Sequence, residues 1–389
     1  MNNTTFRFWI LVAIVAISGF SQGLLLPLIA VIFEQNGLSS SLNGIHATGL
    51  YIGVLLASPF MEKPLRSFGY KPIIIIGGLV VIVSLLLFPM WDSLIFWFLL
   101  RLFIGIGDHM LHFGTQTWIT SFSPEHKRGR NISLYGLSFG IGFAFGPLMT
   151  PLVTYNPSLP FIITAILSLF AWATVFFLKN ELPENLEQQA SETGTLKRFI
   201  QTWKYAWVAF LPPFGYGFLE ASLNGNFPVY ALRSGIDVTS ISILLPAFAI
   251  GSILFQLPLG ILSDKYGRRT ILMIALFTGF SSFTVASFLE HSIFAMFVCF
   301  FIAGMMVGSA FSLGISYMTD LVPKSLLPSG NILCGIFFSF GSISGPFLGG
   351  LYIQFFNDSS FFHVISFMLL ILFILLASFR EQEFVAIKH

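Results

Sequence analysis

The segment RLFIGIGDHMLHFGTQTW, residues 101–118, holds the side chains in this sequence that are best suited to acid–base chemistry. On a helix with 100° per residue, Arg101, Asp108 and His112 fall on one stripe, and Asp108 and His112 are i,i+4 neighbours. Burial and neighbouring charges can bring a carboxylate or an imidazole into the range where it exchanges protons at physiological pH. The spacing therefore predicts a proton-exchanging group on this helix.

Two other interpretations of the stripe stay open. The polar groups can form a static hydrogen-bonded network that braces the helix. Alternatively, Asp108, His109 and His112 contain an H-x-x-H pair beside a carboxylate, but metal sites usually need a third or fourth protein ligand. No partner tract occurs elsewhere in the sequence, so we expect no metal site. Gln116 lies at the edge of the stripe, and His109, about 80° from Arg101 around the helix, is a weaker candidate than Asp108.

The composition indicates which kind of element carries this stripe. Hydrophobic residues make up 55% of the 389 positions and charged residues 9%, with a mean hydropathy of +0.85. Charged residues alone are roughly 25% of a soluble domain, so the chain belongs in lipid. Apolar runs of about 20 residues cross the hydrocarbon core as helices. We predict an all-α membrane protein with twelve transmembrane helices: 8–33, 43–61, 72–90, 94–120, 132–153, 160–178, 205–230, 239–262, 270–289, 293–321, 330–356 and 361–379.

Charged groups inside such helices must face protein or water, because exposure to lipid costs several kcal/mol per charge. We therefore expect the face with Asp108 to line a path through the protein. Glu220 is the other acid near the middle of a predicted span, and Asn224 follows it one turn later. We predict a substrate or proton site there, with a bracing interaction as the alternative.

The positions of Lys and Arg set the predicted orientation, because positively charged loops stay on the cytoplasmic side of a membrane. With both termini in the cytoplasm, every Lys and Arg except Arg101 and Arg233 falls in a cytoplasmic segment. We therefore expect a multi-pass membrane protein with both termini in the cytoplasm. The net charge of +2 follows from this topology and gives no reason to expect a nucleic-acid partner.

An internal repeat divides the chain. GFAFGP at residues 142–147 recurs as GSISGP at 341–346, and FGYKPIII at 68–75 aligns with YGRRTILM at 266–273. We predict two parallel six-helix repeats, residues 1–178 and 205–389, joined by a polar cytoplasmic linker at 179–204; an ordinary long loop is the alternative for that segment. Parallel repeats of this kind form secondary transporters with a site near the midplane.

The repeated glycines and prolines have two compatible interpretations. Glycines four residues apart allow helices to approach closely, and prolines create bends. Packing is one role, and a hinge for alternating access is the other. The residues concerned are Gly142, Gly146, Pro147, Gly341, Gly345 and Pro346.

PLGILSDKYGRRTIL, residues 258–272, closely resembles the G-x-L-x-D-x-x-G-R-R loop signature of the major facilitator superfamily. RLFIGIG at 101–107 resembles its fourth-helix signature, and the G-x-x-x-G-P elements resemble the fifth-helix signature of its antiporter branch. The resemblance covers essentially the whole chain. It is strongest for the bacterial drug:proton antiporter-like group, including the YcaD-like members.

The resemblance also implies a gate. In the superfamily, the loop acid is thought to hold the cytoplasmic side shut with a helix N-terminus and the basic residues of the loop. This implies roles for Asp264, Gly267, Arg268, Arg269 and, in the first repeat, Gly69. The first loop has Arg66 where the second has Asp264, so only the second loop receives the full role. Glu62 can replace the acid or form an ordinary i,i+4 pair with Arg66.

The resemblance, together with the polar stripe at 101–118, implies a monomeric secondary active transporter of a bacterial inner membrane that exports a small molecule in exchange for protons across the lipid bilayer. A proton-linked importer of a metabolite or sugar is the alternative, followed by a receptor-like or lipid-translocating protein without ion coupling. The sequence has no GxxxxGK[ST] motif, so direct ATP coupling is not expected. We expect no cofactor and no enzymatic activity.

Overall fold

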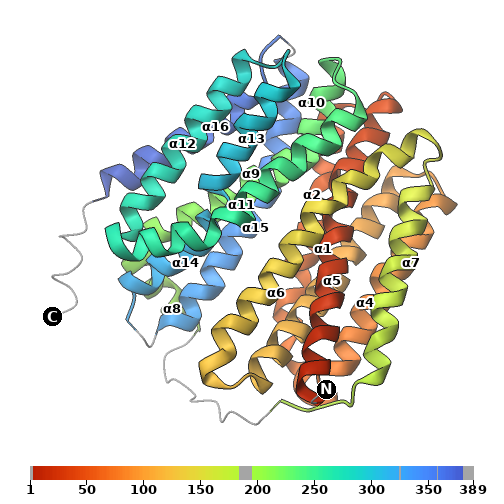
Figure 1. The fold of residues 1–389 in the computed structure, drawn as a ribbon, viewed down its shortest axis with the longest axis vertical. Helices are drawn as coiled ribbons and strands as arrows, with labels where there is room; N and C mark the ends of the chain where they lie inside the picture. The colour runs from red at the N-terminus through yellow and green to blue at the C-terminus, as the bar shows by residue number, and fades with distance from the viewer. Residues whose placement is uncertain (1–2, 184–194, 324–325, 357, 380–389) are drawn as a thin grey trace. The chain divides into compact units, whose positions relative to one another are not determined.

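The computed structural model describes residues 3–183, 195–323, 326–356 and 358–379 (Figure 1). The predicted linker at 179–204 is thus described only at its ends. Of the basic residues that predict the orientation, Lys324, Arg380 and Lys388 lie outside the described residues. Throughout the described ranges, the regular secondary structure is helical.

The chain forms two compact units. Unit 1 comprises residues 1–186 and 231–246 and contains α1 (Asn3–Gln35), α2 (Ser40–Ala57), η1 (Ser58–Phe60), α3 (Glu62–Phe68), α4 (Tyr70–Leu87), η2 (Phe88–Met90), α5 (Leu94–Phe122), α6 (Glu125–Phe145), η3 (Gly146–Thr154), α7 (Leu159–Ala173) and η4 (Thr174–Phe177).

Unit 2 comprises residues 187–230 and 247–389. It contains α8 (Thr195–Ala206), η5 (Trp207–Phe210), α9 (Leu211–Gly225), parts of α10 (Phe227–Arg233) and α11 (Val238–Tyr266), α12 (Arg268–Phe288), α13 (Ile293–Val307), α14 (Ala310–Leu321), α15 (Leu327–Phe355) and α16 (Phe362–Ser378).

Each predicted span contains a helix. Within the described part of the chain, nine helices are long and apolar enough to cross a membrane: Thr4–Gln35, Tyr70–Met90, Leu94–Phe122, Arg130–Thr154, Leu159–Phe177, Val238–Tyr266, Arg268–Phe288, Ile293–Leu321 and Ser329–Phe355. Helix α16 is apolar but shorter. The seventh predicted span is divided into η5, α9 and α10, and the break between α9 and α10 falls at Asn226, two residues before Pro228.

The two repeated prolines have different effects on their helices. Helix α6 gives way at Gly146 to the 3₁₀ helix η3, whereas α15 runs as one α-helix through Pro346. Unit 1 has a second proline, Pro151, four residues after Pro147. Two prolines in successive turns remove two backbone donors, which favours the tighter 3₁₀ arrangement in unit 1.

Glycines bring helix backbones into direct contact in unit 1. A Cβ added to Gly142 would overlap the carbonyl oxygen of Ala16, and one on Gly146 would lie 2.6 Å from that of Phe20, so α6 packs directly on α1. A Cβ on Gly105 would overlap the carbonyl oxygen of Leu50, which joins α5 to α2.

Unit 2 contains equivalent contacts about 198 positions later. Gly341 and Gly345 meet the backbone of Phe214 and Phe218, which joins α15 to α9, and Gly304 meets that of Phe248. The sequence repeat is therefore also a repeat of helix contacts.

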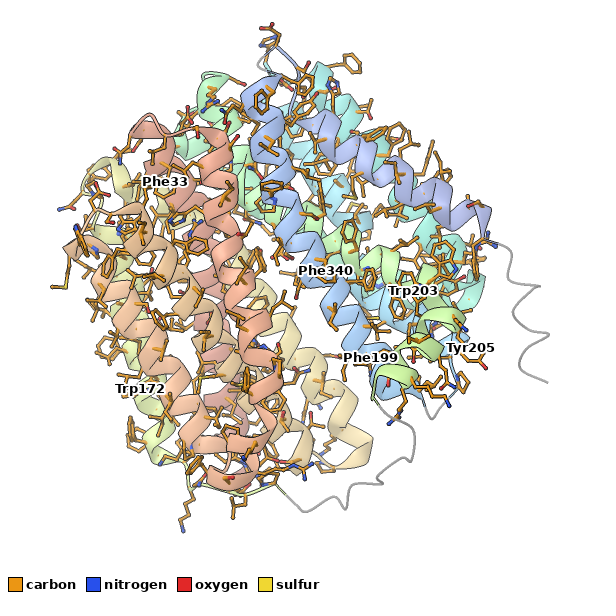
Figure 2. The ribbon with its side chains drawn as sticks, turned by 180° about the vertical axis from the view of Figure 1, so that it is seen from behind. Phe33, Trp172, Phe199, Trp203, Tyr205 and Phe340 are labelled. Atoms are coloured by element: carbon orange, nitrogen blue, oxygen red, sulfur yellow. The ribbon has the colours of Figure 1, made fainter. Side chains whose placement is uncertain are left out.

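Helix α8 forms the described end of the predicted linker and is strongly amphipathic. Figure 2 shows Phe199, Trp203 and Tyr205 on this short helix beside α15, which carries Phe340. The Trp203 ring stacks on Phe337 of α15 with 5.3 Å between ring centroids. Aromatic stacking thus fixes α8 to unit 2.

Candidate functional site

Helix α5 positions the polar stripe inside unit 1. Its 29 residues run without a break from Leu94 to Phe122. Gly107 lies directly against the backbone of Gly77 in α4, so the two helices are in close contact. Arg101 and Asp108 of the same helix are each only 1% exposed, and the hydrogen-bond partners of their side chains, Leu25 and Ser18, lie on α1.

Asp108 and His112 are joined by side chains from two other helices. Ser18 Oγ of α1 donates a hydrogen bond of 2.8 Å to Asp108 Oδ1 and lies 3.3 Å from His112 Nε2. The other ring nitrogen, His112 Nδ1, lies 2.7 Å from the hydroxyl of Tyr135 in α6. Gln22 Nε2 lies 3.5 Å from His112 Nε2. A continuous chain of polar contacts therefore runs from Asp108 to Tyr135.

The partners on α1 and α6 were not predicted from the sequence. Ser18 and Gln22 are spaced i,i+4 in a span whose only other polar residue is Ser21, and this pair was a usable signal of a polar face. Tyr135 follows a polar stretch and carried no comparable signal. The glycine contacts of α6 with α1 explain how both helices reach His112 together.

Arg101 does not belong to this chain of contacts. Its Nη2 lies 3.5 Å from the carbonyl oxygen of Leu25, and its Nη1 has no hydrogen-bond partner among the described residues. In the described ranges, no ion pair joins Arg101 to Asp108. The predicted stripe therefore consists of two separate groups, one around Arg101 and one around Asp108.

The weaker candidates on α5 also lie outside the chain of contacts. His109 stacks on Phe113 with 6.3 Å between ring centroids, and Gln116 is exposed. Among the described residues, no group of three or more His, Cys, Asp or Glu side chains is placed to hold a metal ion. The H-x-x-H spacing on α5 thus has no third ligand within the described part of the chain.

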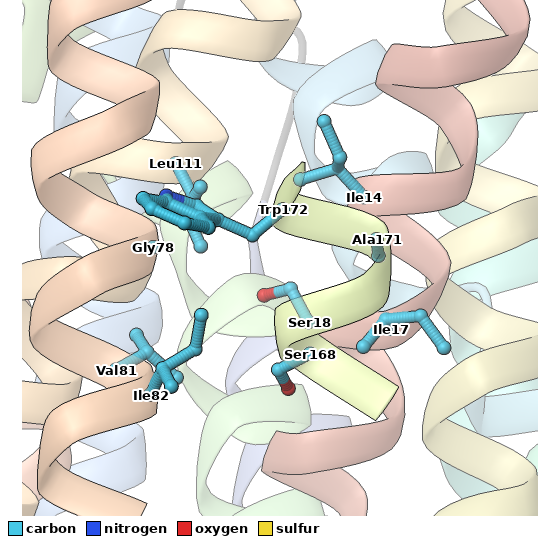
Figure 3. A pocket seen from close by; sticks show the side chains of 10 residues that line it. All are labelled: Ile14, Ile17, Ser18, Gly78, Val81, Ile82, Leu111, Ser168, Ala171 and Trp172. Atoms are coloured by element: carbon cyan, nitrogen blue, oxygen red, sulfur yellow. The ribbon is translucent and has the colours of Figure 1, made fainter. Parts of the chain in front are cut away.

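A small cavity in unit 1 adjoins the site (Figure 3). Its volume of about 20 Å³ accommodates about one water molecule. Ser18 and Ser168 are its polar lining residues, and the Trp172 ring lies across it beside Gly78. The cavity is too small for an organic substrate, but it leaves free space next to Ser18.

Glu220 lies in the middle of α9 in unit 2 and is half-buried. Asn224 Nδ2 donates a hydrogen bond of 2.9 Å to the backbone carbonyl of Glu220, not to its carboxylate. Tyr216 precedes Glu220 by one turn of the helix. Within the described residues, no hydrogen bond or ion pair engages the Glu220 carboxylate. The two predicted residues are neighbours, but their side chains do not form one polar group.

The signature loop of unit 2 is centred on Arg268. Its guanidinium contacts Asp264 Oδ1 at 2.9 Å and Asp320 Oδ2 of α14 at 2.7 Å. Arg269 donates hydrogen bonds of 3.1 Å and 2.9 Å to the carbonyl oxygens of Leu376 and Ala377 at the end of α16. Gly267 has a φ of 90° and separates α11 from α12.

The equivalent turn of unit 1 is held by the chain that follows η4. Gly69 has a φ of 87°, and the next amide, Tyr70 N, donates to the Glu181 carbonyl oxygen at 3.1 Å. The side chain of Asn180 accepts from Lys71 N at 3.1 Å and donates to the Phe68 carbonyl at 2.8 Å. Residues 180 and 181 therefore cap the start of α4.

The Glu181 carboxylate connects this turn to α1 and α5. It forms an ion pair with Arg7 and accepts a hydrogen bond of 2.8 Å from Trp118 Nε1. Partial burial raises the pKa of Glu181. The hydrogen bonds from Trp118 and Arg7, together with the charge of Arg7, have the larger combined effect and hold that pKa below its ordinary value. Glu181 carries no signal in the sequence, because its partners are 63 or more residues away.

Comparison with known proteins gives a consistent result for the whole chain. The sequence model of the Major Facilitator Superfamily matches residues 11–235 and 210–386. The Uncharacterized MFS-type transporter YfkF of Bacillus subtilis (strain 168) is 62% identical over 361 residues, covering 93% of this chain and 92% of that protein. Multidrug resistance protein 2 of the same organism is 23% identical over 357 residues, which is 88% of each protein.

A solved structure has the same fold. The nucleoside transporter NupG superimposes with a TM-score of 0.78 at 15% sequence identity, covering 98% of this chain and 100% of that chain. At this identity, the likeness concerns the fold and not the transported molecule.

Proposed function

The chain belongs to the major facilitator superfamily of membrane transporters, and from that premise we propose that it exports a small molecule in exchange for protons. The observation that carries the proposal is the buried group formed by Asp108, Ser18 and His112. Ionisable residues inside membrane helices are costly and mark ion or substrate pathways. In this proposal, Asp108 carries the proton, His112 modulates it, and Arg101 stabilises the neighbouring backbone.

The proposed cycle is alternating access by two six-helix repeats, residues 1–178 and 205–389, connected by the linker at 179–204. The matched glycine contacts of the repeats support it, because backbone-to-backbone packing holds paired helices as one body. The proposed working form is a monomer in the bacterial inner membrane with both termini in the cytoplasm. Asp264 and Arg268 act as the cytoplasmic gate.

Export is supported by the kinship with a protein named for multidrug resistance. Glu220 is the proposed substrate contact, because it is a membrane-embedded carboxylate without an ion-pair partner in the described part of unit 2. A carboxylate in this setting favours cationic or neutral solutes over anions.

Uptake into proteoliposomes tests both the coupling and its direction. An acidic lumen drives uptake by an antiporter, whereas an acidic exterior drives uptake by a proton-linked importer. The panel should contain lipophilic cations and small metabolites. We expect uptake with the acidic lumen; equal uptake under both gradients and without one would indicate a protein without ion coupling.

Replacement of Asp108 tests the proton-carrying group. We expect Asp108→Asn to abolish gradient-driven uptake while preserving substrate-for-substrate exchange, which needs no net proton movement. Asp237→Asn is the matched control, because Asp237 lies outside the membrane-spanning helices and is exposed. Normal driven uptake by Asp108→Asn would exclude Asp108 as the coupling group. Loss of exchange together with driven uptake would make it a binding or bracing residue.

A further inference from the structure

We propose that Tyr135, His112 and Ser18 form a directional proton relay to Asp108, in which Tyr135 sets the tautomer of His112. This inference rests on the proposed function, since it supplies the route by which the coupling proton reaches Asp108. It gives roles to Ser18 and Tyr135, which stand on different helices from Asp108.

The geometry of the chain of contacts is the first argument. Tyr135 of α6 and Ser18 of α1 lie at opposite nitrogens of the His112 ring, at 2.7 Å and 3.3 Å. Ser18 then reaches Asp108 Oδ1 at 2.8 Å. Tyr135 is 7% exposed, Ser18 5% and Asp108 1%, and His112 between them is half-buried. Every link is therefore within or near hydrogen-bond distance, and both ends of the chain of contacts are buried.

When Asp108 is ionised, the donor and acceptor properties of the four groups determine the direction in which each hydrogen bond is donated. A carboxylate only accepts hydrogen bonds, so the Ser18 hydroxyl must donate to Asp108. The Ser18 oxygen can then accept from His112 Nε2–H. A neutral imidazole with a proton on Nε2 has a bare Nδ1, which accepts from the Tyr135 hydroxyl. One arrangement of hydrogens satisfies all three links.

Proton uptake moves one hydrogen along each link. Tyr135 O–H breaks as His112 Nδ1–H forms, and His112 Nε2–H breaks as a new Ser18 O–H forms. The original Ser18 O–H breaks as Asp108 Oδ1–H forms, and the Tyr135 oxygen regains a proton from water. The net change is one proton taken from water and one carboxylate neutralised.

After Asp108 is protonated, every hydrogen bond in the relay reverses its direction, and each hydrogen still has an acceptor. Neutral Asp108 donates to Ser18, Ser18 donates to Nε2, and Nδ1–H donates to Tyr135. The Tyr135 hydrogen then needs a new acceptor, and the carbonyl oxygen of His112 lies 3.3 Å from the hydroxyl. Thr115 Oγ1 is a second acceptor at 3.3 Å. Both protonation states of Asp108 are thus accommodated without movement of a helix.

Few other groups face the relay. On α5 the neighbouring titratable group is His109, and α1 adds the neutral amide of Gln22. At the level of Gly107, α4 presents Gly77 and Val81. At the level of Gly105, α2 presents Leu50 and Gly53. Arg101 is two helical turns from Asp108 in sequence and has its described contact with Leu25.

The first test removes one hydroxyl and preserves the ring. Tyr135→Phe should lower gradient-driven uptake about a hundredfold or more and remove its slowing in D₂O, while substrate exchange stays near the wild-type rate. Tyr155→Phe is the matched control, because Tyr155 is 82% exposed. Wild-type driven uptake with an unchanged D₂O effect in Tyr135→Phe would overturn the relay.

The second test restores a hydroxyl. Ser18→Ala should impair driven uptake in the same way, and Ser18→Thr should recover it, because the cavity beside Ser18 leaves space for the added methyl group (Figure 3). Equal impairment of both variants would show a packing role and contradict the relay.

A spectroscopic measurement is independent of transport. In protein with ¹⁵N-labelled histidine, we expect the wild-type His112 signals to report the Nε2–H tautomer at alkaline pH and Nδ1–H after acidification. Tyr135→Phe should lose this preference. A tautomer that does not respond to pH or to Tyr135→Phe would overturn the relay.

The outcomes separate this inference from the proposed function. If the uptake rate of the wild-type protein is the same under both pH gradients and without one, proton coupling is refuted, and the relay is refuted with it. Gradient-driven uptake that is lost in Asp108→Asn but normal in both Tyr135→Phe and Ser18→Ala would refute the relay alone.

Discussion

The signature turn at Gly69 in unit 1 and the one at Gly267 in unit 2 share a backbone but differ in their charged partners. Both glycines have left-handed φ values, 87° and 90°. In both turns, a basic side chain two residues after the glycine caps the end of the last helix of its repeat. Lys71 Nζ donates to the Leu178 carbonyl at 2.7 Å, and Arg269 donates to those of Leu376 and Ala377.

The difference lies in the residue between the glycine and that basic side chain. In unit 2 it is Arg268, which bridges Asp264 and Asp320. In unit 1 it is Tyr70, whose ring stacks on Trp118 with 5.4 Å between centroids. The acid of unit 1 comes from Glu181 instead, which pairs with Arg7 and Trp118.

This comparison shows that the two repeats share the same turn but take the acidic residue beside it from different parts of the chain. The unit 2 acids are largely exposed, 65% for Asp264 and 54% for Asp320, so their ion pairs break at little cost. In unit 1 both partners are less exposed, 47% for Glu181 and 14% for Arg7 against 24% for Arg268, and Arg7 also lies 4.1 Å from the centre of the Phe122 ring. We infer that the unit 1 turn is a fixed structural joint and the unit 2 turn is the part that opens.

The largest expected difference comes from adding a methyl group to each turn. The positive φ costs Gly69→Ala and Gly267→Ala about 1–3 kcal/mol each. A Cβ on Gly69 would also lie 2.5 Å from the Glu181 carbonyl oxygen, whereas at Gly267 it would meet only Thr270 Oγ1 at 3.8 Å. Crowding should add about 1–3 kcal/mol at Gly69. Thermal unfolding in detergent measures both; equal losses would contradict the structural difference between the turns.

The next largest effect concerns the two acids. Glu181→Gln should destabilise the protein by about 1 kcal/mol, because Glu181 is half-exposed and its ion pair is partly screened. Asp264→Asn should cost about 0.5 kcal/mol or less but should slow transport, since Arg268 keeps only Asp320. The measurements are the unfolding midpoint and the uptake rate. A stable but inactive Glu181→Gln would assign gating to the unit 1 turn instead.

The pH dependence of stability sharpens the same contrast. The pKa of Glu181 is held below its ordinary value of 4.5, so its ionised form is favoured in the folded state. Its stabilising contribution is complete above about pH 4.5 and is lost as the pH falls further. Wild type and Glu181→Gln should therefore differ in unfolding midpoint at neutral pH and converge as the pH falls from 4.5 through the lowered pKa of Glu181. A difference that persists in acid would show that the effect is not due to ionisation.

The smallest effect on stability and uptake is expected when the acid of the loop signature is introduced into the unit 1 turn. Arg66→Asp places an acid at the position equivalent to Asp264, but Arg66 is exposed and Glu181 already contacts the turn. Stability should change by less than about 0.5 kcal/mol, and uptake should match wild type. A clear gain or loss of uptake would show that position 66 participates in gating.

Most of the fold was predictable from the sequence because hydropathy and repeated motifs are local properties. Each predicted span contains a helix, and Gly142 and Gly341 make equivalent backbone contacts. The breaks in the helices were less predictable. The sequence placed Pro147 and Pro346 in matching motifs, but only the first is followed by a 3₁₀ segment, since Pro151 lies nearby.

Only the residues of the candidate site that lie on α5 could be predicted from the sequence. Asp108 and His112 were predicted from their spacing on one helix, whereas Ser18 is 90 residues from Asp108 and reaches it only through helix packing. The stripe also suggested a link between Arg101 and Asp108. Seven residues span about 10 Å of a helix, and the Arg101 side chain contacts Leu25 instead.

The glycine contacts between α1 and α6 have a mechanical consequence for the relay. Side chains can absorb sliding between helices by changing rotamer, but the α6 glycines rest on the backbone of α1, where nothing can rotate away. A shift of one residue along α1 would drive these backbones into neighbouring side chains. Helices α1 and α6 therefore move as one rigid body, and Ser18 and Tyr135 keep their relative positions. If the relay operates as proposed, the distance between its groups on α1 and α6 is fixed when the two helices pack and stays the same throughout the transport cycle.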